Sequence, residues 1–297
     1  MKIRDTKFLN IVSYAVLYFF FPIFSLHAES SIWKIEHNGK SIYVGGTVHY
    51  LKEADYPLPP EFEMAYKDAK ILVLELNPDE MDKDEMQKYM RENGSYKDDR
   101  SLRTVLSEEV YQEFRKYCKD NGISVMGLNK LKPAILILNL FAFKMKAINA
   151  SPGVDRFFFE KAKTDSKKVI GLETFSDQME IIVSMGEGHE SEFVYQSLLE
   201  LSLMDKMLDE LISIWRSGNL QKVYELQIKK MQTDSPDLYK SMLLDRNNKW
   251  IPKIEKLLET PETEIVLVGD AHLAGPDGLI EVFQKKGYNV TQVKTPK

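Results

Sequence analysis

The sequence is poor in cysteine, which limits how the fold can be stabilised. Cys118 is the only cysteine among 297 residues, so no disulfide can form within the chain. A protein of this length can rely on a hydrophobic core instead, and 43% of its residues are hydrophobic. Cys118 lies in a helical pattern, and we interpret it as a small buried hydrophobe.

Clustered positive charge and long apolar runs are also scarce. The formal net charge is -5, from 40 Lys and Arg against 45 Asp and Glu, which argues against a nucleic-acid-binding surface. The apolar stretch Ala134 to Phe143 is too short to span a bilayer, so we expect no transmembrane helix in the mature chain. There is no His-Glu-x-x-His helix, no Gly-x-Ser-x-Gly elbow and no phosphate-binding loop.

The first 28 residues have the pattern of a secretory signal peptide. Lys2, Arg4 and Lys7 form a basic start, and the stretch from Ile11 to Leu26 is apolar. The pattern predicts cleavage near Ala28 and export to the periplasm or the medium. An uncleaved anchor is the alternative, although the apolar run of about 16 residues is shorter than the ~20 that span a bilayer.

A short phrase occurs twice in the chain, at Ser41–Leu51 and at Glu264–Leu273. Each copy is a β-branched run followed by Gly-x-x-His, and such a run predicts a buried strand. The glycine allows a tight turn, so the histidine lies just past the carboxyl end of the strand, where open α/β sheets bind ligands. Parallel neighbouring strands would bring His49 and His272 together. The alternative is that each histidine only caps its own strand.

Two further strand-like runs end in carboxylates, Glu75 and Glu173. A carboxylate in an apolar strand is costly unless it is paired or binds a metal ion. The four strand ends therefore predict one shared site made of these carboxylates and the two histidines. The alternative for each glutamate is a salt bridge to a buried arginine such as Arg246.

The order of these runs predicts an α/β fold. We expect a mixed, largely parallel central sheet of two related halves with flanking helices, all within one domain, 29–297. Residues 175–260 show no strand pattern and are predicted to form a helical cap over the cleft. Gly122–Leu128 is predicted to be a short strand, and the last strand, near 289–293, should run parallel to the one before His272.

The predicted site residues suit a divalent metal ion. Two imidazoles and one or two carboxylates can hold Zn, Mn, Co or Fe, and the pattern leaves the identity of the metal open. Such an ion can polarise a carbonyl group and can lower the pKa of a bound water molecule toward ~7. A carboxylate could then accept the proton as a general base.

Several phrases carry a family resemblance. They are Gly46-Thr47-Val48-His49, Val73-Leu74-Glu75-Leu76, Gly153-Val154-Asp155, Gly171-Leu172-Glu173-Thr174, Asp245-Arg246-Asn247 and Val268-Gly269-Asp270-Ala271-His272-Leu273-Ala274-Gly275-Pro276-Asp277-Gly278-Leu279. In identity and order they resemble the TraB/GumN (TraB/PrgY/TIKI) family, over a range from about Ile32 to Val293.

The resemblance implies a fold akin to erythromycin esterase-like and ChaN-like proteins. Some family members are metal-dependent proteases that need the paired Gly-x-x-His motifs and a strand-end glutamate. By this resemblance His49, His272 and Glu75 are the candidate metal ligands. The candidate catalytic residues are Glu75, Glu173, Arg246 and Asp155.

The leading hypothesis is therefore an exported metal-dependent hydrolase, with a peptide as the favoured substrate. In this hypothesis Glu173 is a further ligand or the base, and Arg246 steadies a carboxylate or a developing oxyanion. The alternative is a non-catalytic protein that sequesters a peptide or a haem-like ligand on the same fold. The sequence leaves the substrate and the oligomeric state open.

Overall fold

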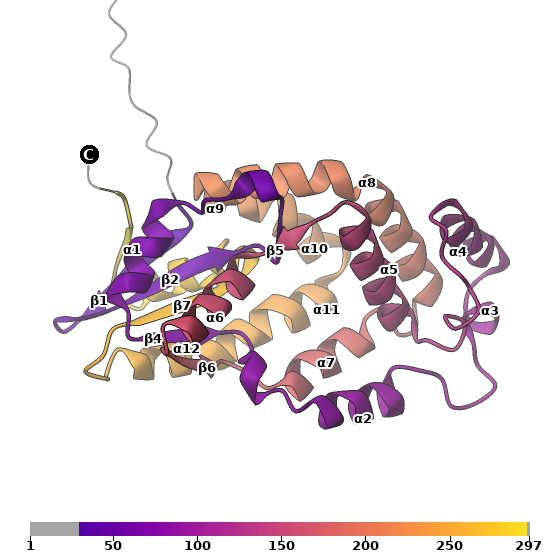
Figure 1. The fold of residues 1–297 in the computed structure, drawn as a ribbon, viewed down its shortest axis with the longest axis horizontal. Helices are drawn as coiled ribbons and strands as arrows, with labels where there is room; N and C mark the ends of the chain where they lie inside the picture. The colour runs from indigo at the N-terminus through magenta and orange to yellow at the C-terminus, as the bar shows by residue number, and fades with distance from the viewer. Residues whose placement is uncertain (1–29, 296–297) are drawn as a thin grey trace, which may run out of the picture.

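The fold is built on a six-stranded sheet with the strand order β6-β4-β7-β2-β1-β8. Its strands lie in the left half of Figure 1. This computed structural model describes residues 30–295, so the predicted signal peptide lies outside the described residues. The six strands are β1 (Ile32–His37), β2 (Lys40–Thr47), β4 (Ile71–Leu74), β6 (Lys168–Gly171), β7 (Glu264–Gly269) and β8 (Asn289–Gln292). A separate two-stranded pair joins β3 (Tyr50–Leu51) to β5 (Ser151–Pro152).

Four neighbouring strands, β6, β4, β7 and β2, run parallel, and the other two form an antiparallel edge. β1 and β2 are joined by a hairpin in which Asn38 and Gly39 both have positive φ, as a tight Asn-Gly turn requires. β8 pairs antiparallel with β1, so it points the same way as β7. The predicted mixed, largely parallel sheet is confirmed, including the direction of its last strand, although β2 and β1 separate β8 from β7.

Helices surround this sheet. They are α1 (Pro60–Asp68), α2 (Lys83–Asn93), α3 (Leu102–Val105), α4 (Glu108–Asp120), α5 (Pro133–Ala147), α6 (Val154–Thr164), α7 (Phe175–Ser184), α8 (Glu190–Ser217), α9 (Leu220–Val223), α10 (Lys229–Asp234), α11 (Pro236–Tyr239), α12 (Asp245–Leu257) and α13 (Leu279–Lys285). Two π-helical turns, Tyr224–Ile228 and Lys240–Leu244, interrupt the series between α9 and α12.

Both faces of the sheet are covered. Leu72 and Leu74 of β4 point into a hydrophobic cluster with α1, α6 and the C-terminal part of α8. Val73, between them, points into a second cluster on the opposite face with α12 and α13. The alternation explains why β4 and β7 read as continuous apolar runs, since most of their residues are buried on one side or the other.

A helical lobe lies beside the sheet and has a hydrophobic cluster of its own, built by α3, α4, α5 and the N-terminal part of α8 (Figure 1). Cys118 is fully buried in this cluster, as predicted, and burial raises the pKa of its thiol to about 11. Helix α8 belongs to both parts, because Leu198 packs in the lobe and Trp215 packs against the sheet.

The predicted strand at Gly122–Leu128 is wrong. The segment forms turns after α4, in which the N–H of Ile123 donates to the Cys118 carbonyl at 2.7 Å and the N–H of Leu128 donates to the Val125 carbonyl at 3.0 Å. Ile123, Val125 and Leu128 pack against the cluster of the lobe, whereas Met126 is exposed. Apolar β-branched composition alone therefore misled the prediction where no strand edge was available for pairing.

Residues 175–260 contain no strand in this structure, as predicted. Their action as a cap over the site stays a prediction. Among the helices of residues 30–295, none is both long and apolar enough to cross a membrane.

Candidate functional site

A predicted site residue follows each of the four parallel strands. In order across the sheet these are Glu173 after β6, Glu75 after β4, His272 after β7 and His49 after β2. Because the strands are parallel neighbours, their carboxyl ends lie at one edge of the sheet. The strand ends therefore converge as the sequence predicts.

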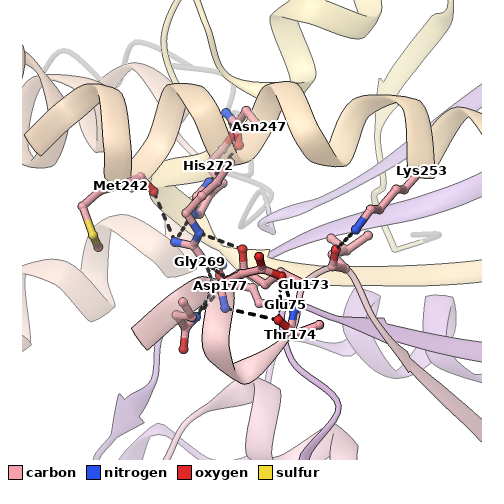
Figure 2. A network of polar contacts seen from close by, with 12 residues as sticks. Glu75, Glu173, Thr174, Asp177, Met242, Asn247, Lys253, Gly269 and His272 are labelled. Carbon is pink, nitrogen blue, oxygen red and sulfur yellow. Dashed lines mark hydrogen bonds and ion pairs between the residues drawn. The ribbon is translucent and has the colours of Figure 1, made fainter. Parts of the chain in front are cut away.

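Glu75, Glu173 and His272 lie close together in Figure 2. The guanidinium group of Arg246, near the start of α12, contacts all three side chains. Its Nη2 lies 2.5 Å from Oε2 of Glu75 and 2.6 Å from Oε1 of Glu173, and its Nε lies 3.1 Å from Oε2 of Glu173. Its Nη1 lies 3.0 Å from Nε2 of His272 and donates to the Met242 carbonyl at 3.2 Å. All three guanidinium nitrogens are therefore used, and Arg246 is only 5% exposed.

Aromatic packing and an unusual helical turn hold this arginine in place. The guanidinium carbon of Arg246 lies 4.7 Å from the ring centroid of Trp250, whose ring also packs against that of His272 at 4.4 Å. The carbonyl of Met242 comes from the π-helical turn Lys240–Leu244, directly before α12. Such turns are frequent at functional sites, and here one supplies an acceptor to the arginine.

Asn247 fixes the protonation pattern of His272. The amide nitrogen of Asn247 donates to the backbone carbonyls of His272 and Asp277, at 3.1 and 2.9 Å, so its oxygen must face Nδ1 of His272, 2.8 Å away. Burial lowers the pKa of His272 to about 3, so its ring is neutral at pH 7. Nδ1 therefore carries the proton, and Nε2 accepts a hydrogen bond from Arg246.

Glu75 is held in its charged form. The N–H of Gly269 donates to its Oε1 at 2.8 Å. Burial alone would raise the pKa of the Glu75 carboxyl, but the charges of His272, Arg246 and His49 outweigh burial and lower the pKa to about 2. His272 contributes only when it is protonated, well below neutral pH, so Arg246 is the close cation at pH 7.

His49 lies in a different environment, open to solvent. Its Nδ1 forms an ion pair with Oδ2 of Asp155 at 3.4 Å, and the two side chains are 62% and 34% exposed. The Asp155 carboxylate accepts from the ring and raises the pKa of His49 to about 9, against a lowering by burial. The charges of Glu75 and Asp270 add to the rise.

Gly153 explains how Asp155 reaches His49. A Cβ atom built on Gly153 would lie 2.0 Å from the Val48 carbonyl oxygen and 2.3 Å from the carbonyl carbon of His49. Only glycine therefore allows the start of α6 to approach the turn after β2 this closely. The N–H of Val154 then donates to the Val48 carbonyl at 3.1 Å. The phrase Gly153-Val154-Asp155 thus holds the start of α6 against the turn that carries His49.

The six predicted residues form two groups. The guanidinium centre contains Arg246, Glu75, Glu173 and His272, and the His49–Asp155 pair stands beside it. The salt-bridge alternative for both glutamates is confirmed, because both contact Arg246. Within residues 30–295, no three His, Cys, Asp or Glu side chains are arranged so that they could hold a metal ion.

Four polar residues of the site were not singled out from the sequence. Asn247 and Asp270 lie inside the phrases that carry the resemblance, which was a usable signal. Gln178 on α7 donates to Glu173 at 3.1 Å, and nothing in its helical context marks it. Gln227 lies in the other π-helical turn and contacts both carboxylate oxygens of Asp270 at 3.2 Å. Burial raises the pKa of Asp270 to about 6.

Together, the fold and the site define an α/β protein that gathers a charged, mostly buried polar cluster at the carboxyl ends of its parallel strands. The sequence model of the TraB/PrgY/gumN family matches residues 31–292, nearly the whole chain. The chain therefore belongs to this family, as the motif phrases indicated. Neither a curated protein nor a solved structure matches the chain.

Proposed function

We propose that this protein is an exported hydrolase of peptide bonds, in which His49 transfers the proton and Asp155 orients its ring. One observation carries the proposal. Of the four strand-end residues, His49 alone has a side chain that is largely open to solvent. Its Nδ1 is paired with a carboxylate. A substrate that reaches this edge of the sheet therefore meets Nε2 of His49 first.

The chemistry proposed for this pair is general base and acid catalysis. The base is the neutral form of His49, whose fraction grows as the pH rises toward its pKa of about 9. With Asp155 at Nδ1, Nε2 of this form can take a proton from an attacking water molecule and return it to the departing amine. In this proposal the buried guanidinium centre has a supporting role, because Arg246 neutralises charge on Glu75 and Glu173 and fixes the strand ends beside His49. The substrate class is proposed from family membership and from the open edge of the sheet.

The divalent metal ion predicted from the sequence requires a donor set of His49, His272 and Glu75. In this arrangement Nε2 of His272 and Oε2 of Glu75 both face Arg246, and Nδ1 of His49 faces Asp155. The residues as placed do not fit the ion, so the proposal includes no step that depends on it. The metal stays a prediction of the sequence pattern, and metal content is its test.

The proposal is tested by incubating the full chain, purified from the cell envelope, with a mixed peptide pool and identifying the products by mass spectrometry. We expect new peptide termini that His49→Ala abolishes and that Asp155→Asn strongly reduces. His37→Ala is the matched control, because His37 is exposed on the hairpin far from this edge. Peptide binding that saturates without any cleavage, in the wild type and in Glu75→Gln alike, would favour the sequestering protein instead.

A further inference from the structure

Two of the three predicted metal ligands, His272 and Glu75, already contact a cation that belongs to the chain, as does the predicted further ligand Glu173. Glu75, Glu173 and His272 each direct one side-chain atom or more at the guanidinium of Arg246, over 2.5 to 3.1 Å. We infer that Arg246 is the resident cation of this centre, in place of a divalent metal ion, and that the same acceptors bind a metal only when Arg246 is removed.

The geometry of the acceptors favours a guanidinium over a metal ion. Metal ligands point at one shared point from roughly 2 Å. Here the acceptors contact different nitrogens of the planar guanidinium group. His272 contacts Nη1, Glu75 contacts Nη2, and Glu173 contacts both Nη2 and Nε. The contacts of Glu173 are bidentate, a pattern that matches arginine and carboxylate groups.

The surroundings also hold each partner in the orientation that arginine needs. The N–H of Gly269 holds the second oxygen of Glu75, and Asn247 holds His272 with Nε2 as an acceptor. The ring of Trp250 covers the guanidinium. A planar delocalised cation gains from such an aromatic face, as guanidinium groups do.

The ion pairs point the same way. The guanidinium of Arg246 contacts both carboxylates, at 2.5 Å for Glu75 and 2.6 Å for Glu173. Buried carboxylates are costly unless they are paired or bind a metal ion, so Arg246 supplies the positive charge that a metal ion would otherwise bring.

The inference concerns the same site as the proposed function, but its test needs no turnover. Wild-type full chain, purified without chelator, is assayed for Zn, Mn, Co and Fe by mass spectrometry and then titrated with Zn²⁺ or Co²⁺ by calorimetry. We expect well below one equivalent of metal in the wild type and about one equivalent in Arg246→Ala, which His272→Ala in the same chain removes. Added methylguanidinium should compete with the metal in Arg246→Ala.

Arg216→Ala is the matched control, because Arg216 also faces a carboxylate, that of Asp55, away from this centre. It should remain without metal. If Arg246→Ala does not fold, Arg246→Gln replaces it, and the wild-type metal content is decided independently of either variant. Stoichiometric metal in the wild type that Glu75→Gln removes would overturn the inference, and so would a folded Arg246 variant that takes up no metal. Absent peptidase activity would count against the proposed function alone.

Discussion

The guanidinium centre and the His49–Asp155 pair lie at the same edge of one sheet, yet they are built in opposite ways. Arg246 is 5% exposed and every nitrogen of its fork has a partner, whereas the side chain of His49 is 62% exposed and Asp155 is its one ion-pair partner in the described chain. The buried group is a fixed part of the structure, and the exposed pair remains available to a ligand. Similar strand-end positions therefore do not imply similar roles.

Removing the buried arginine should produce the largest effect. Arg246→Ala leaves the carboxylates of Glu75 and Glu173 buried without their cation, and breaking such a pair typically costs about 3–5 kcal/mol. Urea unfolding at pH 7 and low ionic strength measures the loss. His49→Ala should change the free energy of unfolding far less, because its ring is exposed.

Neutralising the partners together checks the cause of that loss. In a triple variant with Glu75→Gln, Glu173→Gln and Arg246→Met, no charge is left unpaired in the centre, so much of the lost stability should return. If the triple variant is as unstable as Arg246→Ala, the loss reflects packing against Trp250 and not unpaired charge.

Acid should have the next largest effect, because it destabilises the guanidinium centre. His272 has a folded-state pKa of about 3, below its unfolded value of ~6.5, so the unfolded chain binds the proton first as the pH falls through this window. The contribution of His272 to the free energy of unfolding should therefore fall from pH 6.5 to 3, by up to about 1.4 kcal/mol per pH unit. Glu75, lowered to about 2, adds a loss of the same sign below pH 4.5.

Urea unfolding from pH 7 to 4 tests this dependence, and His272→Gln should flatten it above pH 4.5. His189→Gln is the control, because His189 is exposed. His49 contributes to stability with the opposite pH dependence to His272. Its pKa is raised, so its small, solvent-screened contribution is present below pH 6.5 and is lost as the pH rises through about 9. If His272→Gln leaves the pH dependence of the free energy of unfolding unchanged, that dependence does not come from His272.

Gly153→Ala should have an intermediate effect that acts through the backbone. The new Cβ would overlap the Val48 carbonyl, so α6 or the turn after β2 must move, at a cost of about 1–3 kcal/mol. The displacement should separate Asp155 from His49 and lower the pKa of His49, which NMR titration reports. Gly287→Ala is a control in a turn where a Cβ meets no atom within 4 Å, although its φ of 88° makes some strain unavoidable.

Asp155→Asn should have the smallest effect on stability and a clear effect on titration. Because solvent screens this exposed pair, the free energy of unfolding should fall by less than in Arg246→Ala or Gly153→Ala. The pKa of His49 should fall from about 9 toward 6.5, because the carboxylate that raises it is gone. If His49 acts as the base, the cleavage rate should level off at a lower pH in this variant. An unchanged NMR titration of His49 would show that Asp155 is not its main partner.

The sequence predicted the positions of the site residues better than their mutual contacts. β-branched runs followed by Gly-x-x-His predict strands and their ends, because period and composition are local properties. The contact of Arg246 with both glutamates depends on how α12 crosses the sheet and was foreseen only as an alternative. The π-helical turns that supply Met242 and Gln227 have no sequence signature. Gly122–Leu128 has the local composition of a strand, but the tertiary environment that decides whether it pairs is not encoded locally.

Helix α8 has a mechanical consequence for the site. One end of this single element is embedded in the lobe, and at the other end the indole of Trp215 donates to the carbonyl of Gly46 at 2.7 Å. Gly46 is the second-last residue of β2, shortly before the turn that carries His49. Helix α8 thus connects the core of the lobe directly to the strand that delivers His49.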